Sequence, residues 1–133
     1  MAISKVLIAN RGEITIRITS ACAELNITSV AIFAEDDAGA LHVRKADESV
    51  ALTGVGVTAY LDIPQIIKAA QQHQCDAIHP GYGFLSESSE FSQACESAGI
   101  ILVGPTPLTL DALGDKAKAR DLAIKHHIPL PQG

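Results

Sequence analysis

The chain has 133 residues, a length typical of one domain, and 47% of them are hydrophobic, enough to build a substantial core. Ten Lys and Arg residues against 15 Asp and Glu residues give a net charge of −5 without a basic patch, which argues against binding to nucleic acid or to an anionic membrane. No signal peptide or membrane span is evident, and the cysteines have no C-x-x-C spacing. We therefore expect a single cytoplasmic domain over 1–133 with reduced thiols at Cys22, Cys75 and Cys95.

Short apolar runs alternate with amphipathic stretches along the chain. The first run, KVLIAN, predicts a strand that is buried on both faces. The helix expected after it has an apolar stripe of Ile14, Ile18, Ala21, Cys22 and Leu25. A short, weakly periodic helix is expected within 37–47, and a glycine-rich connector at 53–60. The predicted strands lie at 5–10, 28–34, 48–52, 75–80 and 100–103.

Helix signals mark the second half of the chain as well. Pro64 fits the first turn of a helix, and Gly99 is placed to end the helix that follows the fourth strand. Residues 106–114 and 115–127 read as two further helical stretches, followed by an extended tail at 128–133. Strands that alternate with helices in this way predict an α/β fold, in which a Rossmann-like parallel sheet carries helices on both faces.

Three loops are expected at the carboxyl ends of strands, where such sheets bind ligands: NRGE, HPGYGFLSE and GPTP. A dinucleotide site is disfavoured, because the first strand-to-helix turn, IANRGEI, has one glycine where the G-x-G-x-x-G fingerprint needs three. The bulky Arg11 also occupies the crowded part of that turn. The long loop HPGYGFLSE, with two glycines and two aromatic residues, is the more distinctive feature.

The sequence resembles the N-terminal domain of biotin carboxylase, the ATP-dependent component of biotin-dependent acetyl-CoA, propionyl-CoA and pyruvate carboxylases. The motifs KVLIANRGEI, RI, HV…ADE, YLDI, AIHPGYGFLSE, GP and GDK occur in order from residue 5 to about residue 131. IANRGEI and HPGYGFLSE are long and specific. This domain precedes the ATP-grasp domain, and related ligases share its general fold without these two motifs.

The resemblance implies a function in a larger enzyme, an ATP-dependent ligase. In this family, ATP and bicarbonate form carboxyphosphate, whose carboxyl group passes to biotin on a carrier protein. The implied cofactors are ATP, magnesium and biotin. The implied partners are bicarbonate, the biotin carboxyl carrier domain, and the ATP-grasp and carboxyltransferase domains, in an enzyme expected to be a homo-oligomer. The N-terminal domain would supply one wall of the carboxylation site, with Tyr82, Gly83 and Phe84 in that wall.

Other residues of these motifs have simpler interpretations. The loop could be only a strand-to-helix connection, with Ser86 as the helix N-cap and Glu87 near the positive helix end. We expect His79 to be a packed strand-end histidine rather than a base. Arg11 is expected in a buried ion pair, and Glu13 as a first-turn acid. No catalytic residue is assigned.

Lys116, in the motif GDK, is the expected ATP contact. A lysine near a helix start is ordinarily a solvated residue, but in the family the lysine of this motif contacts the phosphates of ATP. His126 and His127 stand beside no other clustered ligands, so no metal site is assigned. The magnesium ligands of the family belong to the ATP-grasp domain. We therefore expect the isolated chain to be inactive.

One position departs from the bacterial pattern. Bacterial biotin carboxylases place a basic residue of the first helix in a homodimer contact, where this chain has Ser20, although Arg17 and Glu24 are retained. A carboxylase with its domains fused in one long chain is therefore as plausible as the bacterial type. The alternative from another class is a non-catalytic binding or assembly module that retains the fold.

Overall fold

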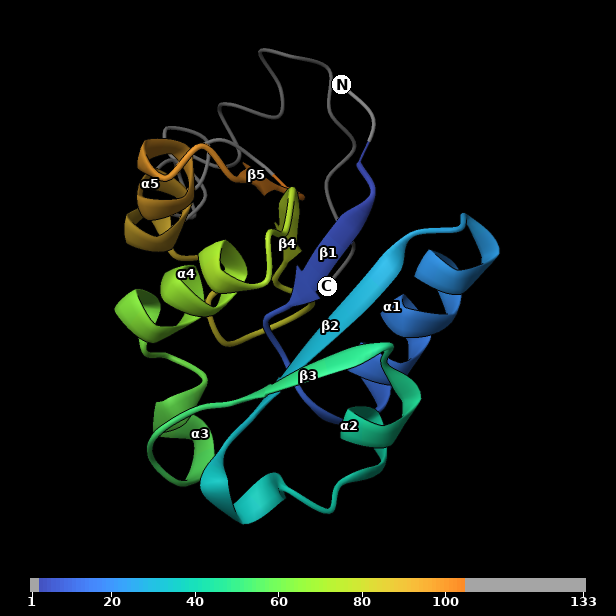
Figure 1. Ribbon diagram of the computed structural model, residues 1–133. Helices are drawn as coiled ribbons and strands as arrows, with labels where there is room; N and C mark the ends of the chain where they lie inside the picture. Colours follow the sequence, from blue (N-terminus) through green and yellow to red (C-terminus); the bar gives the residue numbers. More distant parts are fainter. Residues whose placement is uncertain (1–2, 105–133) are drawn as a thin grey trace, which may run out of the picture.

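The computed structural model describes residues 3–104, which form a parallel sheet with helices on both sides (Figure 1). The strands are β1 (Lys5–Ile8), β2 (Thr28–Phe33), β3 (Glu48–Ala51), β4 (Ala77–His79) and β5 (Ile101–Leu102). The helices are α1 (Gly12–Glu24), the 3₁₀ turn η1 (Glu35–Asp37), α2 (Leu41–Lys45), α3 (Gly56–Ala59), α4 (Ile63–Gln72) and α5 (Ser89–Ser97). The five predicted strands are all present, each slightly shorter than predicted.

β1 is the central strand of a sheet whose order is β3-β2-β1-β4-β5. It pairs in parallel with β2, where Leu7 lies opposite Val30, and with β4, where Leu7 lies opposite Ile78. The chain therefore winds outward from β1 through β2 to β3, and returns to the other side of β1 for β4 and β5. The predicted α/β fold with a Rossmann-like parallel sheet is confirmed.

Each face of β1 belongs to a different apolar layer. Leu7 joins the larger core with Ile66 of α4 and Phe91 of α5, whereas Val6 packs in a smaller core with Cys22 of α1. Figure 1 shows the same division, with α1 and α2 on one side of the sheet and α4 and α5 on the other. Because β1 is buried from both sides, its sequence is a continuous apolar run rather than an alternating one.

The predicted buried stripe of α1 is correct at Cys22, which is buried, and at Ile18, which packs against the smaller core, but wrong elsewhere. Thr15, Thr19 and Cys22 are the buried residues of this helix, whereas Leu25 is 70% exposed. Apolar periodicity overlooks threonine, although its branched side chain packs in a helix much as valine does. Part of the predicted stripe instead lines an apolar groove of about 220 Å³ beside α1 (lining residues Ile3, Val6, Ile18, Ala21, Cys22, Leu25, Ile27, His79 and Val103).

The expected connector at 53–60 contains a helical turn, α3. The amide of Gly56, the first residue of α3, donates to Asp36 Oδ1 at 3.0 Å, and that of Gly54 donates to Glu35 Oε2 at 2.8 Å. These two carboxylates belong to η1, which lies some 20 residues earlier in the chain. Because these partners are distant in sequence, local propensity did not reveal the turn.

The start of α5 also differs from the prediction. Ser88, rather than Ser86, is the N-cap, and its Oγ accepts a hydrogen bond of 3.1 Å from the amide of Phe91. Ser86 instead belongs to the preceding turn, because its amide donates to the carbonyl of Gly83 at 2.9 Å. At the other end, Gly99 has a φ of +73° and follows the last turn of α5, as predicted.

The cysteines agree with the prediction, since Cys22, Cys75 and Cys95 are free thiols and all are buried. None of the helices within residues 3–104 is long and apolar enough to cross a bilayer.

Candidate functional site

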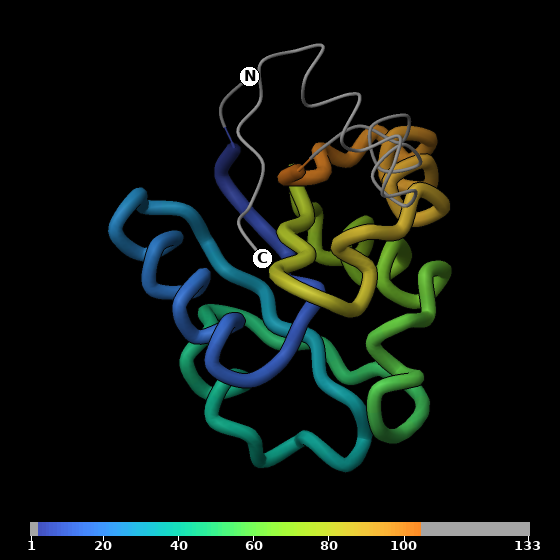
Figure 2. Tube along the Cα trace, turned by 180° about the vertical axis from the view of Figure 1, so that it is seen from behind, coloured from blue at the N-terminus to red at the C-terminus, as the bar shows by residue number. Residues whose placement is uncertain are grey.

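The loops that follow β1 and β4 meet at one edge of the sheet. Their strands are neighbours in the sheet. The chain passes from β1 to β2 on one side of β1, whereas β4 lies on the other side of β1. This reversal is the topological switch point at which open α/β sheets bind their ligands. In Figure 2, the yellow loop that follows β4 passes beside the blue turn that follows β1. The candidate site is therefore built from residues 9–12 and 79–86.

The loop after β4 has an unusual backbone. Gly81 and Gly83 both have a φ of +65°, and Phe84 has a φ of +47°. Glycine adopts such angles without penalty, but a residue with a Cβ does so at a cost of about 1 kcal/mol or more. A chain that places three left-handed residues within four positions needs contacts that hold it in this shape.

Asn10 supplies the central contact. Its side chain is 1% exposed, and Nδ2 donates to the carbonyl of Pro80 at 2.8 Å and to that of Tyr82 at 2.7 Å. Its Oδ1 accepts from the amide of Arg11 at 2.8 Å. A Cβ added to Gly81 would lie 2.8 Å from Asn10 Nδ2, so the loop can wrap this closely only with glycine at that position.

A second set of contacts holds the other end of the loop. The centres of the Phe84 and Tyr60 rings are 5.6 Å apart. The guanidinium carbon of Arg11 also lies 5.6 Å from the centre of the Tyr60 ring. Arg11 Nη1 lies 3.2 Å from Asp37 Oδ2, and the Tyr60 hydroxyl donates to the same oxygen at 2.7 Å. The predicted ion pair of Arg11 therefore exists, with Asp37, but it is only half-buried.

The electrostatics of this cluster follow from the shared carboxylate. The hydrogen bond from the Tyr60 hydroxyl, followed by the contacts with Arg11, lowers the pKa of Asp37. Burial, together with the negative charge of Asp37, raises the pKa of Tyr60. Asp37 therefore stays ionised and Tyr60 stays neutral at physiological pH, which keeps the hydrogen bond and the ion pair in place.

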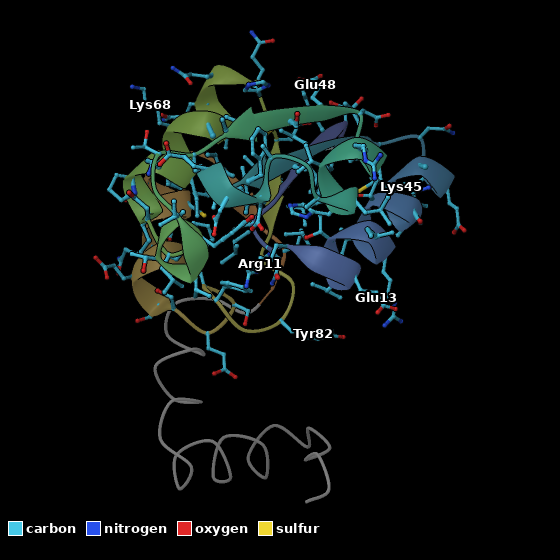
Figure 3. All side chains as sticks on the ribbon, turned by 90° about the horizontal axis from the view of Figure 1, so that it is seen from below. Arg11, Glu13, Lys45, Glu48, Lys68 and Tyr82 are labelled. Carbon is cyan, nitrogen blue, oxygen red and sulfur yellow. The ribbon has the colours of Figure 1, made fainter. Side chains whose placement is uncertain are left out.

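The three predicted wall residues take different positions. Tyr82 is 77% exposed, and Figure 3 shows its side chain extending away from the domain on the side where Arg11 lies. Gly83 is exposed beside it. Phe84 is half-buried and packs against the larger core, so that it anchors the loop. The exposed part of the loop therefore includes the Tyr82 ring and the backbone at Gly83.

His79 is held by the loop and the sheet. Its Nδ1 accepts from the amide of Gly81 at 3.1 Å, and its ring lines the apolar groove beside α1. Burial lowers the pKa of this histidine, which favours the neutral imidazole. These contacts agree with the expected packed histidine. Glu13 is the exposed first-turn acid of α1 that was predicted.

The described part of the chain was also compared with the donor sets that metal ions require. Within residues 3–104, no three His, Cys, Asp or Glu side chains are grouped so that they could hold a metal ion. Lys116, the predicted ATP contact, and the two histidines His126 and His127 lie outside the described residues.

Comparison with known proteins shows the family of this domain. The sequence profile of the family described as "Biotin carboxylase, N-terminal domain" matches residues 2–110. The chain belongs to this family. It is 52% identical to human mitochondrial pyruvate carboxylase over 134 residues, which cover 98% of this chain. It is 53% identical to Bacillus subtilis pyruvate carboxylase over 135 residues, which cover 99% of this chain. The chain spans only 11% and 12% of the length of these two relatives.

Solved structures give the same result. The biotin carboxylase domain of a single-chain bacterial carboxylase superposes with a TM-score of 0.87 at 54% identity, covering 96% of this chain and 30% of that one. A complete pyruvate carboxylase from Rhizobium etli superposes with a TM-score of 0.88 at 49% identity. The match covers 98% of this chain and 14% of the Rhizobium etli chain. The fold of this chain is thus that of the N-terminal part of biotin carboxylase domains.

Sequence reasoning missed three residues of the site. Asn10 belongs to the motif NRGE and Tyr60 to the motif YLDI, but neither motif assigns a role to these side chains, and no sequence signal marks Asp37. A polar residue directly after a buried strand was the available signal for Asn10. Its partners lie 70 and 72 residues away, so their identity could be known only from the strand order.

Proposed function

We propose that this chain is the N-terminal domain of a biotin-dependent carboxylase, in which it contributes to the ATP- and bicarbonate-dependent carboxylation of carrier-bound biotin. The observation that supports this function is the exposed Tyr82–Gly83 segment, held at the switch point of a biotin carboxylase N-terminal domain. The identities of 52% and 53% to pyruvate carboxylases favour an enzyme with its domains fused in one chain.

The two residues suit a flat, polar substrate group. The aromatic ring of Tyr82 provides a face for stacking and a hydroxyl at its edge. Gly83 lets a ligand approach the backbone without meeting a side chain. Together they form one wall, while the catalytic groups, the magnesium ligands and most of the ATP pocket belong to other domains. Lys116 would add a point charge toward the phosphates of ATP.

This division of labour defines the partners. The domain would act with an ATP-grasp domain, a biotin carboxyl carrier domain and a carboxyltransferase domain in a homo-oligomeric enzyme that uses ATP, magnesium, bicarbonate and biotin. The isolated chain would not be a ligase. Three free, buried thiols suit a reducing compartment such as the cytoplasm.

Tyr82→Ala in the full-length enzyme tests the proposal. We expect kcat/KM for free biotin to fall about three- to tenfold, because an aromatic stacking contact typically contributes about 0.5–1.5 kcal/mol. Bicarbonate-dependent ATP cleavage without biotin should stay near the wild-type rate. Both rates are measured by coupled ADP release, in the presence and absence of biotin.

Leu25→Ala is the matched control, because Leu25 is also a large exposed side chain, 70% exposed, at the far end of α1. It should leave both rates unchanged. If Tyr82→Ala lowered both rates equally together with the melting temperature, the loop would be a structural connection only. A wild-type protein without any biotin- or bicarbonate-dependent ATP cleavage would favour the alternative, a non-catalytic binding or assembly module.

A further inference from the structure

Asn10 uses every hydrogen-bonding group of its side chain. Both hydrogens of Nδ2 are donated to carbonyls, at 2.8 Å and 2.7 Å, and Oδ1 accepts from the amide of Arg11 at 2.8 Å. This pattern fixes the orientation of the amide, because carbonyls can meet only Nδ2 and an N–H can meet only Oδ1. An aspartate, which has the same shape, could not donate both bonds at neutral pH.

The two carbonyls that accept hydrogen bonds from Asn10 Nδ2 lie on either side of Gly81 in the chain. The carbonyls of Pro80 and Tyr82 both point to Asn10, so the intervening peptide units cannot rotate without breaking one of them. The amide of Gly81 is also held, by His79 Nδ1 at 3.1 Å. Asn10 therefore fixes the backbone from which the Tyr82 side chain projects.

The Tyr82 side chain has little support of its own. It is 77% exposed, and among residues 3–104 no hydrogen bond to its hydroxyl is present. By contrast, Phe84 is anchored against Tyr60 and the core. The direction of the Tyr82 ring consequently depends on its backbone, and its backbone depends on Asn10.

We propose that Asn10 is the positioning residue that directs Tyr82 toward biotin in the carboxylation site. This inference rests on the proposed function, in which Tyr82 lines the wall of that site. Asn10 touches no reacting atom itself. It raises the fraction of molecules in which the exposed Tyr82 ring already has its binding geometry. The entropy cost of ordering this loop when biotin binds is therefore smaller.

Asn10→Asp in the full-length enzyme tests the proposal by steady-state kinetics. We expect the KM for free biotin to rise about five- to tenfold, because loss of one or both hydrogen bonds from Nδ2 disorders the loop. The KM for ATP and the biotin-independent ATP cleavage should stay within about twofold of wild type, since the nucleotide is held mainly by other domains in the proposed division of labour.

Ser29→Ala is the matched control. Ser29 is also 1% exposed and bonded to a distant residue, Asp47, but it lies near the amino end of β2, on the opposite edge of the sheet. It should lower the melting temperature without changing the ratio of biotin-dependent to biotin-independent activity. An Asn10→Asp enzyme that behaved like Ser29→Ala would show that Asn10 is only structural, and would overturn the proposal.

Hydrogen exchange tests the same contact without using activity. In Asn10→Asp, the amides of Gly81 and Ser86 should exchange faster than in wild type, while the amides of α4 should be unchanged. Unchanged exchange at Gly81 would overturn the positioning role even if the enzyme proved to have another function. Conversely, faster exchange together with an inactive wild-type enzyme would count against the proposed function alone.

Gly81→Ala approaches the contact from the loop side. Its Cβ would lie 2.8 Å from Asn10 Nδ2, so it should raise the KM for biotin as Asn10→Asp does. In the double variant Asn10→Ala with Gly81→Ala, the 2.8 Å approach to Nδ2 is gone and only the 3.3 Å approach to the Cβ of residue 10 is left, so the combined effect should be smaller than the product of the effects of Asn10→Ala and Gly81→Ala measured singly. Fully multiplicative effects would mean that the two residues act independently.

Discussion

Tyr60 links the two halves of the site through its ring, and its hydroxyl group holds the segment after β2. It is fully buried, donates to Asp37 Oδ2 at 2.7 Å and accepts from the amide of Ala34 at 3.2 Å. Its ring also contacts Arg11 and Phe84. One side chain thus connects the turn after β1, the segment after β2 and the loop after β4.

Tyr60→Phe should destabilise the protein by about 1–2 kcal/mol, because it removes a hydrogen bond to a charged group while it keeps the ring. The measurement is urea denaturation at neutral pH. Tyr82→Phe is the control, since it removes an exposed hydroxyl, and should leave the free energy of unfolding unchanged. Equal effects of the two variants would show that the Tyr60 hydroxyl contributes nothing.

The same pair of variants has an expected pH dependence. The folded protein lowers the pKa of Asp37 from its ordinary value of 3.8, so its contribution to stability is present above that pH and is lost as the pH falls through the folded-state pKa. Tyr60→Phe removes the main cause of the shift. The stability difference between wild type and Tyr60→Phe should therefore narrow below about pH 3.8, and a constant difference would contradict this origin.

At the scale of elements, the start of α5 gives a direct test of the corrected cap. Ser88→Ala should lower the free energy of unfolding by about 1 kcal/mol, because the amide of Phe91 loses its partner. Ser86→Ala should change it by only a few tenths of a kcal/mol, since the hydrogen bond of Ser86 uses its backbone amide. Chemical denaturation of both variants makes the comparison, and the reverse order would restore Ser86 as the cap.

The strands were easier to predict than the packing face of α1. A parallel strand between two helical layers must be apolar on both faces, so its sequence marks it without any knowledge of its neighbours. The interior face of α1 is formed by Thr15, Thr19 and Cys22. A search for apolar residues passes over the two threonines, because each carries a hydroxyl group. Which line of a helix faces the sheet depends on the neighbouring elements, here α2 as well as β1 and β2.

At the scale of the whole molecule, the sequence predicts that the loop after β4 lies at the carboxyl edge of the sheet, but not which contacts hold the loop there. The loop after β4 was expected at the carboxyl edge because glycines and aromatic residues follow a buried strand. The contact between Asn10 and Tyr82 joins residues 72 positions apart, and follows only once β1 and β4 are known to be neighbours. The roles of Tyr82, Gly83 and Phe84 in carboxylation, and that of Lys116, remain predictions.

The isolated chain should not bind Mg-ATP more tightly than millimolar. Millimolar binding already requires about 4 kcal/mol, whereas one exposed contact between a lysine and a phosphate contributes about 1 kcal/mol. Lys116 is the nucleotide contact that we propose, and residues 3–104 contain no group of His, Cys, Asp and Glu side chains suited to a metal ion. We also expect no bicarbonate-dependent ATP cleavage.

Calorimetric titration of the isolated chain with Mg-ATP makes this measurement, and the full-length enzyme serves as the positive control. Saturable binding in the micromolar range would place a complete nucleotide site within these 133 residues, and would show that the proposed division of labour between domains is wrong.

The central position of β1 has a consequence for the order in which the domain is assembled during translation. β1 is synthesised first, and one of its edges can pair with β2 once residue 31 is available, whereas its other edge must wait for residues 77–79. Proteins emerge from the ribosome with the N-terminus first. For most of the synthesis of this domain, the nascent chain thus carries an apolar strand with one unpaired edge, next to Asn10, which becomes buried only in the folded domain. Chaperones bind exposed strand edges of this kind, and aggregation can start from them.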